Sequence, residues 1–335
     1  MKALRLGLLA VLVTLITPPG AQSAKPPVEG PMPSLARADA WLNSRPLSTQ
    51  ELRGKVVLVD FWTYTCINWR RTLPYLRAWD EKYREHGLVI VGVHTPEFSF
   101  EQNLDNVRHA AQEQDVDYPV ALDSKYAIWN AFDNHYWPAV YLIDARGHIR
   151  HQQFGEGNYD QLEREIQKLL AEAGHNGFDR ALAMPEAHGA EVAADWRNLG
   201  SPETYVGSQQ AERKVASAPS GLKLNQWTLT GDWTTREERA VANRAGAKIA
   251  YRFHARDVHV VMGPSTRSTA VRFRVTVDGQ PPRASHGVDV DAQGNGTLDQ
   301  PRMYQLIRVS PPIADRLIEI EFLDPGAEVY VFTFG

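Results

Sequence analysis

The stretch VVLVDFWTYTCINWRRTLPYL, residues 56–76, decides the fold of this chain. Its first six residues are mostly apolar and predict a buried strand, because short apolar runs are typical of strands covered on both faces. A short turn follows, and the segment from Cys66 to Arg84 has the pattern of an amphipathic helix that contains Pro74. Cys66 is the only cysteine of the chain. The sequence therefore predicts a strand–turn–helix unit with the thiol where the helix begins.

The position of Cys66 bears on its reactivity. The thiolate is the reactive form of cysteine, and the unpaired N–H groups and positive dipole end of a helix N-terminus favour it. Arg70 and Arg71 follow within about one helical turn and add positive charge. We therefore expect the pKa of the Cys66 thiol to lie below its usual value of about 8.5. The alternative is a small buried apolar side chain, as most free cysteines are.

The rest of the first half of the chain continues the alternation of strands and helices. Strands are predicted at 88–94, 139–144 and 148–154, and helices at 101–114, 124–132 and 158–173. This order implies a mixed sheet covered by helices on both faces. We assign residues 24–37 to a leader and residues 38–174 to this α/β domain.

The second half of the chain belongs to another structural class. Residues 175–219 are rich in Ala, Gly, Pro and Ser and are interpreted as a linker with some helix. After it, apolar and polar residues alternate with period two at 271–277, 318–322 and 330–334. Such strands, separated by Gly, Pro and Asp turns, predict an antiparallel β-sandwich over residues 220–335.

The N-terminus and the composition indicate where the protein works. Residues 1–23 have the charged start, short apolar run and small residues of a secretory signal peptide. We therefore expect export to the periplasm or the medium, and a protein that is soluble after cleavage. The formal net charge of −4 gives no indication of nucleic-acid binding. A single cysteine in an oxidising compartment cannot form an internal disulfide, so it is reactive toward partners or buried and inert.

The residues around Cys66 resemble the thioredoxin fold. The residues that resemble this family are VVLVDFW followed by TYTC, Pro74 eight residues after Cys66, and the segment YWPAVYLID. In that family a proline kinks the helix that carries the active cysteines, and a second proline opens the strand beside the site with a cis peptide bond. The resemblance implies that Pro138, preceded by Trp137, has this cis bond.

Longer stretches are most similar to TlpA/DipZ-like thiol–disulfide oxidoreductases, in particular to the soluble C-terminal part of DipZ-type proteins. They include WLNSRPLSTQELRGKVVLVDFWTYTCIN, VIVGVHTPEFSFE, SPETYVG, LNQWTLTGDW and FLDPGAEVYVFTFG. The resemblance implies a thioredoxin-like domain followed by a carbohydrate-binding-module-like sandwich. One departure is decisive: the family motif is Cys-x-x-Cys, and this chain has Trp69 at its second cysteine position.

The departure limits the chemistry that the resemblance implies. In the dithiol mechanism the first thiolate attacks a disulfide and the second cysteine resolves the mixed disulfide. Trp69 cannot do so, and its indole must either fill space beside Cys66 or turn toward solvent. We expect single-cysteine thiol–disulfide chemistry at Cys66, with mixed disulfides to envelope proteins or small thiols that an external thiol resolves. One alternative is a degenerate redox fold that binds a glycan or a protein. Another is a one-cysteine peroxidase, because Thr63-x-x-Cys66 matches part of a peroxiredoxin site.

Further residues are candidates for tuning or lining the site. The resemblance implies proton transfer by a buried Asp60 and by Glu97 from a neighbouring loop, because buried carboxyls with raised pKa values act near neutral pH. The alternatives are a structural Asp60 with satisfied hydrogen bonds and a solvated Glu97 in its loop. Residues expected to line the site are Trp62, Thr63, Tyr64, Thr65, Trp69, Trp137 and Pro138. The four aromatic residues form either a rim that docks extended peptide or part of the core. No cofactor or metal is expected, and the segment DVDAQGNGTLDQ, residues 289–300, is interpreted as a polar turn rather than a calcium loop.

Overall fold

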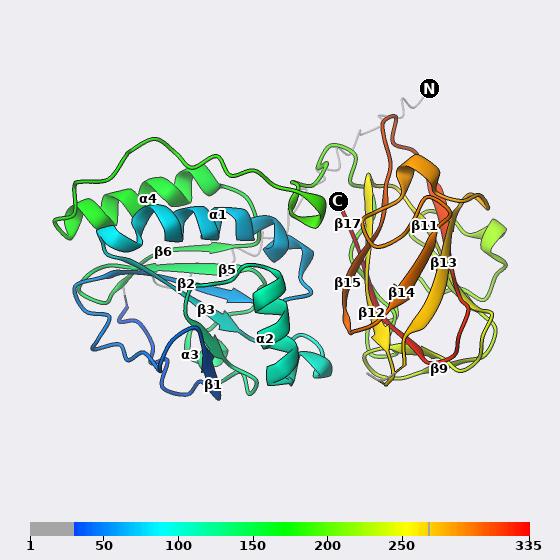
Figure 1. Cartoon of the computed structure of the whole chain (residues 1–335), viewed down its shortest axis with the longest axis horizontal. Coiled ribbons are helices and arrows are strands. Elements are labelled where there is room, and N and C mark those ends of the chain that lie inside the picture. Colours follow the sequence, from blue (N-terminus) through cyan, green and yellow to red (C-terminus); the bar gives the residue numbers. More distant parts are fainter. Residues whose placement is uncertain (1–29, 267–268) are drawn as a thin grey trace, which may run out of the picture.

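The computed structural model describes residues 30–266 and 269–335, which form an α/β domain and a β-sandwich lying side by side (Figure 1). The predicted signal peptide lies outside the described residues. Within them, no helix combines the length and the apolar character that a membrane crossing requires. The fold class expected from the sequence is confirmed: a thioredoxin-like domain is followed by an all-β domain.

The α/β domain is built on one mixed sheet with the strand order β1-β4-β3-β2-β5-β6. β2, β3 and β4 are parallel, and β1, β5 and β6 run antiparallel to their neighbours. The strands are β1 (Ala40–Leu42), β2 (Val56–Trp62), β3 (Leu88–His94), β4 (Val120–Leu122), β5 (Ala139–Ile143) and β6 (Ile149–Phe154). The short edge strand β1 and the short strand β4 beside it were not predicted.

Helices cover both faces of this sheet, as predicted. Leu58 and other residues of one face of β2 pack with α1, α2 and α4, whereas Val59 and its face pack with α3. The helices are α1 (Ile67–Tyr83), α2 (Leu104–Glu113), α3 (Ala127–Ala131) and α4 (Tyr159–Glu172). The 3-10 turns in the described residues are η1 (Arg84–His86), η2 (Ser99–Gln102), η3 (Gly189–Glu191), η4 (Pro219–Gly221) and η5 (Arg283–Ser285).

The predicted helix 101–114 is divided in the structure. Residues up to Gln102 form η2, and α2 begins only after Asn103. The Asn103 side chain accepts hydrogen bonds from the backbone N–H groups of Asp105 and Asn106. An asparagine in this role is a strong N-cap, and it ends the preceding turn where a new helix starts.

The second domain is a sandwich of two antiparallel sheets with its core between them. One sheet contains β7 (Thr204–Tyr205), β9 (Trp233–Thr235), β10 (Ala240–Ala242), β12 (Asp257–Pro264), β15 (Arg302–Arg308) and β17 (Ala327–Phe334). The other contains β8 (Trp227–Thr230), β11 (Ala247–Phe253), β13 (Val271–Val277), β14 (Asn295–Leu298) and β16 (Arg316–Phe322). Along β13 the apolar residues are buried and Arg272 and Arg274 are exposed, so the period-two alternation predicted its two faces.

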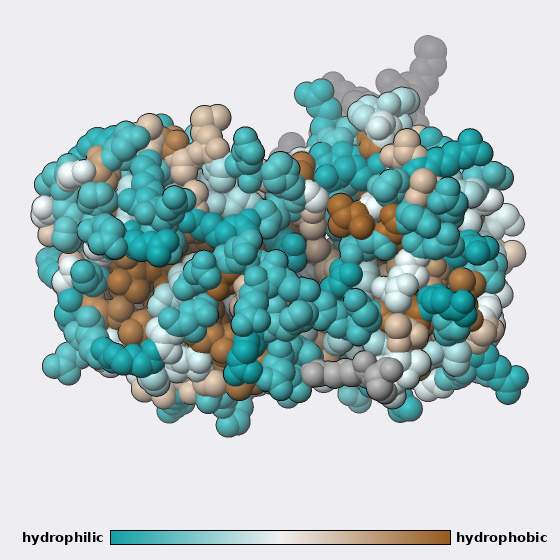
Figure 2. Space-filling view, viewed as in Figure 1, coloured by the Kyte–Doolittle hydropathy of each residue, from teal (hydrophilic) through white to brown (hydrophobic). Residues whose placement is uncertain are grey.

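The two domains share an apolar interface. The sheet with β12, β15 and β17 faces the α/β domain (Figure 1), and Tyr330 of β17 packs against Phe98 and Phe100 with ring centroids 5.1 and 4.8 Å apart. The stretch predicted as a linker takes part in this arrangement, because β7 pairs with β17. Around the interface, hydrophilic residues cover most of the face shown in Figure 2.

Candidate thiol site

Cys66 lies at the first turn of α1, directly after the turn that follows β2. It is the N-cap residue of α1 with extended backbone angles, and its carbonyl accepts the N–H of Arg70 at 3.0 Å. Its side chain is partly buried. The predicted strand–turn–helix placement of the thiol is therefore confirmed.

Pro138 lies at the same end of the sheet as Cys66, just before β5. β5 pairs with β2 so that Ala139 lies opposite Phe61, which places Pro138 next to the turn that carries Cys66. The Trp137–Pro138 peptide bond is cis, as the resemblance implied.

Trp69 fills the space behind the thiol instead of facing solvent. Its side chain has no exposed surface, and its ring stacks on Trp62 with centroids 4.2 Å apart. The indole N–H donates a hydrogen bond of 2.8 Å to Asp60 Oδ2. The second position of the motif therefore holds a packed and hydrogen-bonded aromatic side chain, and the indole takes part in the hydrophobic core.

Asp60 is buried in β2 behind the turn. Burial raises the pKa of its carboxyl to about 7, against the opposing effect of the Trp69 hydrogen bond. The other carboxyl oxygen, Oδ1, is buried with no hydrogen-bond partner among the described residues. Because its pKa is near neutrality, Asp60 can hold or release a proton under ordinary conditions.

Glu97 lies beside Cys66 in a cluster to which the sandwich contributes. The Tyr205 hydroxyl hydrogen-bonds to Glu97 and lies 3.2 Å from Glu203 Oε2, so β7 and the residue before it meet the loop after β3. Burial and the charges of Glu203 and Glu101 raise the pKa of Glu97 to about 8. The sequence analysis placed Glu97 near the thiol but gave no role to Glu203 or Tyr205.

The pKa of Cys66 shifts in the direction opposite to our expectation. Burial, followed by the negative charges of Glu97 and Glu203, raises the pKa of the thiol well above its usual value. The two arginines do not compensate, because their guanidinium groups point elsewhere. Arg71 pairs with Glu156 at 2.9 Å, and Arg70 extends into a cavity between the domains. The helix N-terminus alone does not outweigh burial and two nearby carboxylates.

Glu101 is a second buried carboxylate that the sequence analysis missed. It accepts hydrogen bonds from the Thr65 hydroxyl at 2.6 Å and from the N–H groups of Glu97 and Phe98 at 2.6 and 2.9 Å. Thr63 is fully buried in the same turn. Glu101 thus ties the loop after β3 to the turn before Cys66. The sequence around Glu101 contains no pattern that predicts this role.

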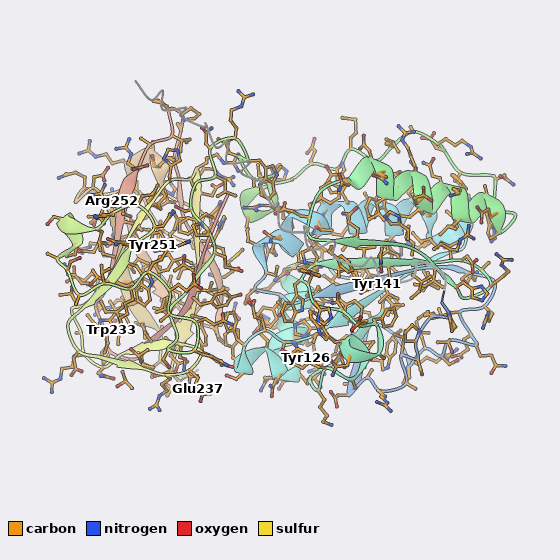
Figure 3. The ribbon with its side chains drawn as sticks, turned by 180° about the vertical axis from the view of Figure 1, so that it is seen from behind. Tyr126, Tyr141, Trp233, Glu237, Tyr251 and Arg252 are labelled. Carbon is orange, nitrogen blue, oxygen red and sulfur yellow. The ribbon has the colours of Figure 1, made fainter. Side chains whose placement is uncertain are left out.

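The four aromatic candidates divide between core and cavity. Trp62, Tyr64 and Trp69 are buried, and Tyr64 stacks on the buried His94. Trp137 is partly exposed and lines a cavity of about 240 Å³ between the domains, together with Glu97, Tyr205 and other residues. From behind, Figure 3 shows Glu237, which also lines this cavity, at the edge of the sandwich facing the α/β domain. The sandwich therefore covers the face that carries the thiol.

The segment 289–300 is held together by its own side chains. Asp291 accepts hydrogen bonds from the backbone N–H groups of Gln293 and Asn295, and Asp289 pairs with Arg302 at 2.8 Å. Among the described residues no group of three or more His, Cys, Asp or Glu side chains is arranged to hold a metal ion.

A thiol at the start of a helix, a cis-proline beside it and a mixed sheet between helices define a thioredoxin-like protein. Residues 27–170 match the Redoxin family model, and residues 201–335 match the model described as Thioredoxin like C-terminal domain. The chain belongs to the thioredoxin-like thiol–disulfide oxidoreductase family.

The chain is similar to two curated relatives and, in part, to one solved structure. Protein DipZ of Mycobacterium tuberculosis is 33% identical over 321 residues, which are 91% of this chain and 43% of the relative, so the chain spans less than half of that protein. Thiol-disulfide oxidoreductase YkuV of Bacillus subtilis is 33% identical over 142 residues, 42% of this chain and 95% of the relative. A solved thioredoxin-like protein in the oxidized form is 33% identical and covers 44% of this chain and 98% of its own length, with a TM-score of 0.41.

Proposed function

We propose that this protein carries out thiol–disulfide exchange with a single thiol, that of Cys66. The thiol loses its proton, and the thiolate attacks one sulfur of a partner disulfide. A Cys66–partner disulfide forms, and the other partner sulfur leaves as a thiolate and takes up a proton. An external thiolate then attacks the mixed disulfide, forms a disulfide with the partner and releases Cys66. Each cycle exchanges one disulfide for another with no net oxidation.

The observation that carries this proposal is the contrast between positions 66 and 69. Cys66 is partly exposed at the start of α1, whereas Trp69 is fully buried and bonded to Asp60. The chain therefore keeps the cysteine that attacks a disulfide in the first step of the family's reaction. It lacks the second cysteine, which would resolve the mixed disulfide within the molecule.

The electrostatic environment makes the first step slow near neutral pH. Because the pKa of Cys66 is raised, only a small fraction of the thiol is ionised there. Glu97, with a pKa of about 8, is mostly neutral near pH 7 and becomes a repelling charge at higher pH. Glu97 therefore opposes thiolate formation most strongly in alkaline solution.

A pH profile of alkylation tests the proposal. We expect the rate of iodoacetamide reaction at Cys66 to have its midpoint above about 8.5 in the wild type. Glu97→Gln is expected to lower that midpoint and to raise the rate several-fold at about pH 9, because it removes a charge that destabilises the thiolate. Asp133→Asn, with a side chain 81% exposed, is the control for loss of a carboxylate elsewhere. An unchanged midpoint in Glu97→Gln contradicts the assigned role of Glu97.

The exchange itself is followed by intact mass after incubation with glutathione disulfide at about pH 9. One adduct that a second thiol removes is expected in the wild type, and none in Cys66→Ser. If the wild type forms no adduct, the protein does not act through its thiol.

That outcome would favour a second candidate function, a binding module built on a degenerate redox fold. Its supporting observation is the coverage of the thiol face by the sandwich, where burial and the nearby charges of Glu97 and Glu203 raise the pKa of Cys66. The ligand in that case is a protein or, as the resemblance of the sandwich implies, a glycan.

We further propose that the protein is exported and meets envelope protein disulfides or small thiols. The support is the signal-peptide pattern of residues 1–23. Fractionation of cells that express the full chain tests this. An uncleaved N-terminus in the cytoplasmic fraction contradicts it.

A further inference from the structure

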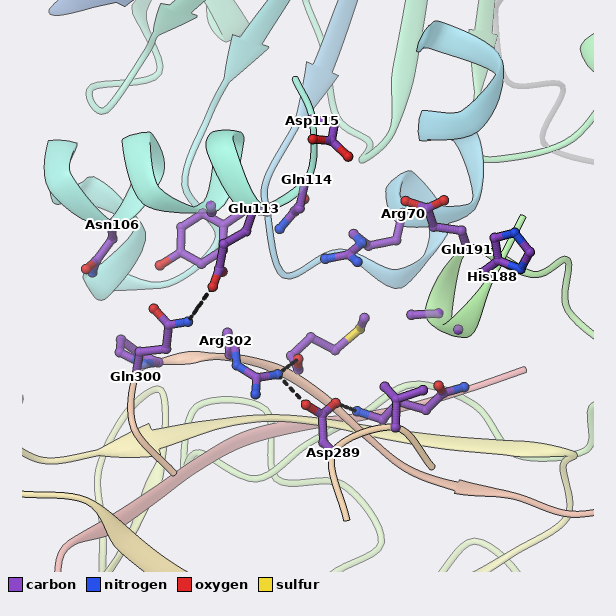
Figure 4. Close-up of a pocket in the computed structure, with 18 of the residues that line it drawn as sticks. Arg70, Asn106, Glu113, Gln114, Asp115, His188, Glu191, Asp289, Gln300 and Arg302 are labelled. Carbon is purple, nitrogen blue, oxygen red and sulfur yellow. Dashed lines mark hydrogen bonds and ion pairs between the residues drawn. The ribbon is translucent and has the colours of Figure 1, made fainter. Parts of the chain in front are cut away.

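A second and larger cavity lies between the domains. Its volume is about 860 Å³, and it is lined by α1, α2 and η3 on one side and by the sandwich around β15 on the other (Figure 4). Cys66, Glu97 and Tyr205 do not line it. It is therefore separate from the site assigned to thiol exchange.

Arg70 is the unusual member of this cavity. Figure 4 shows its guanidinium reaching from α1 into the space between Gln114 and Arg302. Arg70 is largely removed from solvent, and burial lowers the pKa of its guanidinium. Its Nε is fully buried, and its side chain has no hydrogen bond or ion pair with any part of the chain that the structure describes. Because the Nε of this partly exposed cation is buried without a partner, a role in binding an anion explains its position better than packing does.

The other two arginines of the cavity are already paired. Arg77 Nη2 lies 2.6 Å from Glu191 Oε2, and Arg302 Nη1 lies 2.8 Å from Asp289 Oδ1. Asp115 also lies 3.9 Å from Arg77, and Asp299 lies 4.0 Å from Arg302, so among the described lining residues Arg70 is the arginine without a carboxylate within 4 Å. The side chains of four further acidic lining residues are exposed, so water and salt screen their charges: Glu113, Asp115, Glu186 and Asp299.

Gln114 supplies a second unpartnered group. Its side chain is buried at the end of α2, and Oε1 has no hydrogen-bond partner among the described residues. Oε1 can only accept a hydrogen bond, whereas the Arg70 guanidinium can only donate. A ligand that satisfies both groups therefore needs an anionic acceptor for Arg70 and a hydroxyl donor for Gln114.

We propose that this cavity binds a small hydroxylated organic monocarboxylate, whose carboxylate pairs with Arg70 and whose hydroxyl donates to Gln114. A carboxylate matches the planar fork of the guanidinium. A single negative charge is enough to pair with Arg70, the arginine of the described lining that has no carboxylate within 4 Å. The site lies within one helical turn of Cys66 but does not use the thiol, so Cys66→Ser is expected to bind the ligand as the wild type does.

Calorimetry on the full chain tests the proposal with gluconate, galacturonate and lactate as probes. Galactose lacks the carboxylate and acetate lacks the hydroxyl groups, so these are the paired negative probes. We expect at least one hydroxy acid to bind, and its neutral or unhydroxylated counterpart to bind about tenfold more weakly or worse. Binding of none of the three, or equal binding of acetate, overturns the proposal.

Two arginine variants locate the site. Arg70→Gln is expected to weaken binding of the hydroxy acid by about tenfold or more. Arg244→Gln removes an exposed arginine of the sandwich, which pairs with Asp232, and is expected to leave binding unchanged. Unchanged affinity in Arg70→Gln overturns the assignment.

A melting experiment without ligand separates binding from structure. Because Arg70 has no partner, Arg70→Gln is expected to melt at the wild-type temperature or above it. A lowered melting temperature without ligand, together with no binding of any probe to the wild type, would make Arg70 a structural residue and overturn the proposal.

Discussion

Trp69→Cys is expected to form an intramolecular disulfide with Cys66 and to gain dithiol reductase activity that the wild type lacks. Residues three apart at a helix start are neighbours on one face of the helix, and a disulfide tolerates Cα separations of about 4.4–6.8 Å. The turn and the start of α1 already have the family arrangement. Insulin reduction measures the gain, and intact mass under oxidising conditions detects the loss of two hydrogens.

The same substitution is expected to destabilise the fold. Trp69 is fully buried against Trp62, and truncating a tryptophan in a core costs about 3–5 kcal/mol. Asp60 also loses its one indole donor, and an orphaned buried acceptor costs about 1–3 kcal/mol. Because these losses share one site, they are not additive. Urea denaturation of the reduced protein measures the total.

Two controls separate the thiol from the truncation. Trp69→Ser makes a similar cavity without a sulfur and is expected to lose stability but gain no activity. Adding Cys66→Ser to Trp69→Cys is expected to abolish both the disulfide and the activity. A folded Trp69→Cys protein that forms no disulfide would show that Cys66 does not stand where the family mechanism needs it, and the binding-module function would then be preferred.

The parts of the site that could be predicted from sequence are those with a local cause. The apolar run 56–61 and the turn before Cys66 set the position of the thiol, and the segment around Pro138 matched a known signature. Asp60 is buried because it lies inside a strand that is covered on both faces. Each of these results depends on residues close together in the sequence.

The electrostatics of the site could not be predicted in this way. Glu203 and Tyr205 approach Cys66 only because the sandwich packs on the thiol face. Arg71 turns away because its guanidinium pairs with Glu156 and donates to the carbonyl of Phe334 near the C-terminus. No local pattern specifies such contacts between distant segments, so the expected direction of the thiol pKa was wrong although its position was right.

Asp60→Asn is expected to make the protein more stable relative to the wild type as the pH rises. Burial raises the pKa of the Asp60 carboxyl from 3.8 to about 7. For a folded-state pKa above the unfolded one, the favourable contribution is complete below the unfolded value and is lost as pH rises through the folded value. Three units at about 1.36 kcal/mol each amount to about 4 kcal/mol lost by the wild type between about pH 4 and pH 7.

Asparagine avoids this loss because it stays neutral at every pH and still accepts the indole N–H of Trp69. Its amide N–H₂ would meet the place where Oδ1 now has no partner, which costs about 1–3 kcal/mol at all pH values. At about pH 4 the variant is therefore expected to be less stable than the wild type. Its unfolding free energy relative to the wild type is expected to rise by about 4 kcal/mol from about pH 4 to about pH 8. Denaturant titrations at the two pH values measure it, with Asp133→Asn as the control for loss of an exposed carboxyl. A difference that stays constant would mean that Asp60 is ionised inside the fold across this range, and it could not then hold a proton for the thiol.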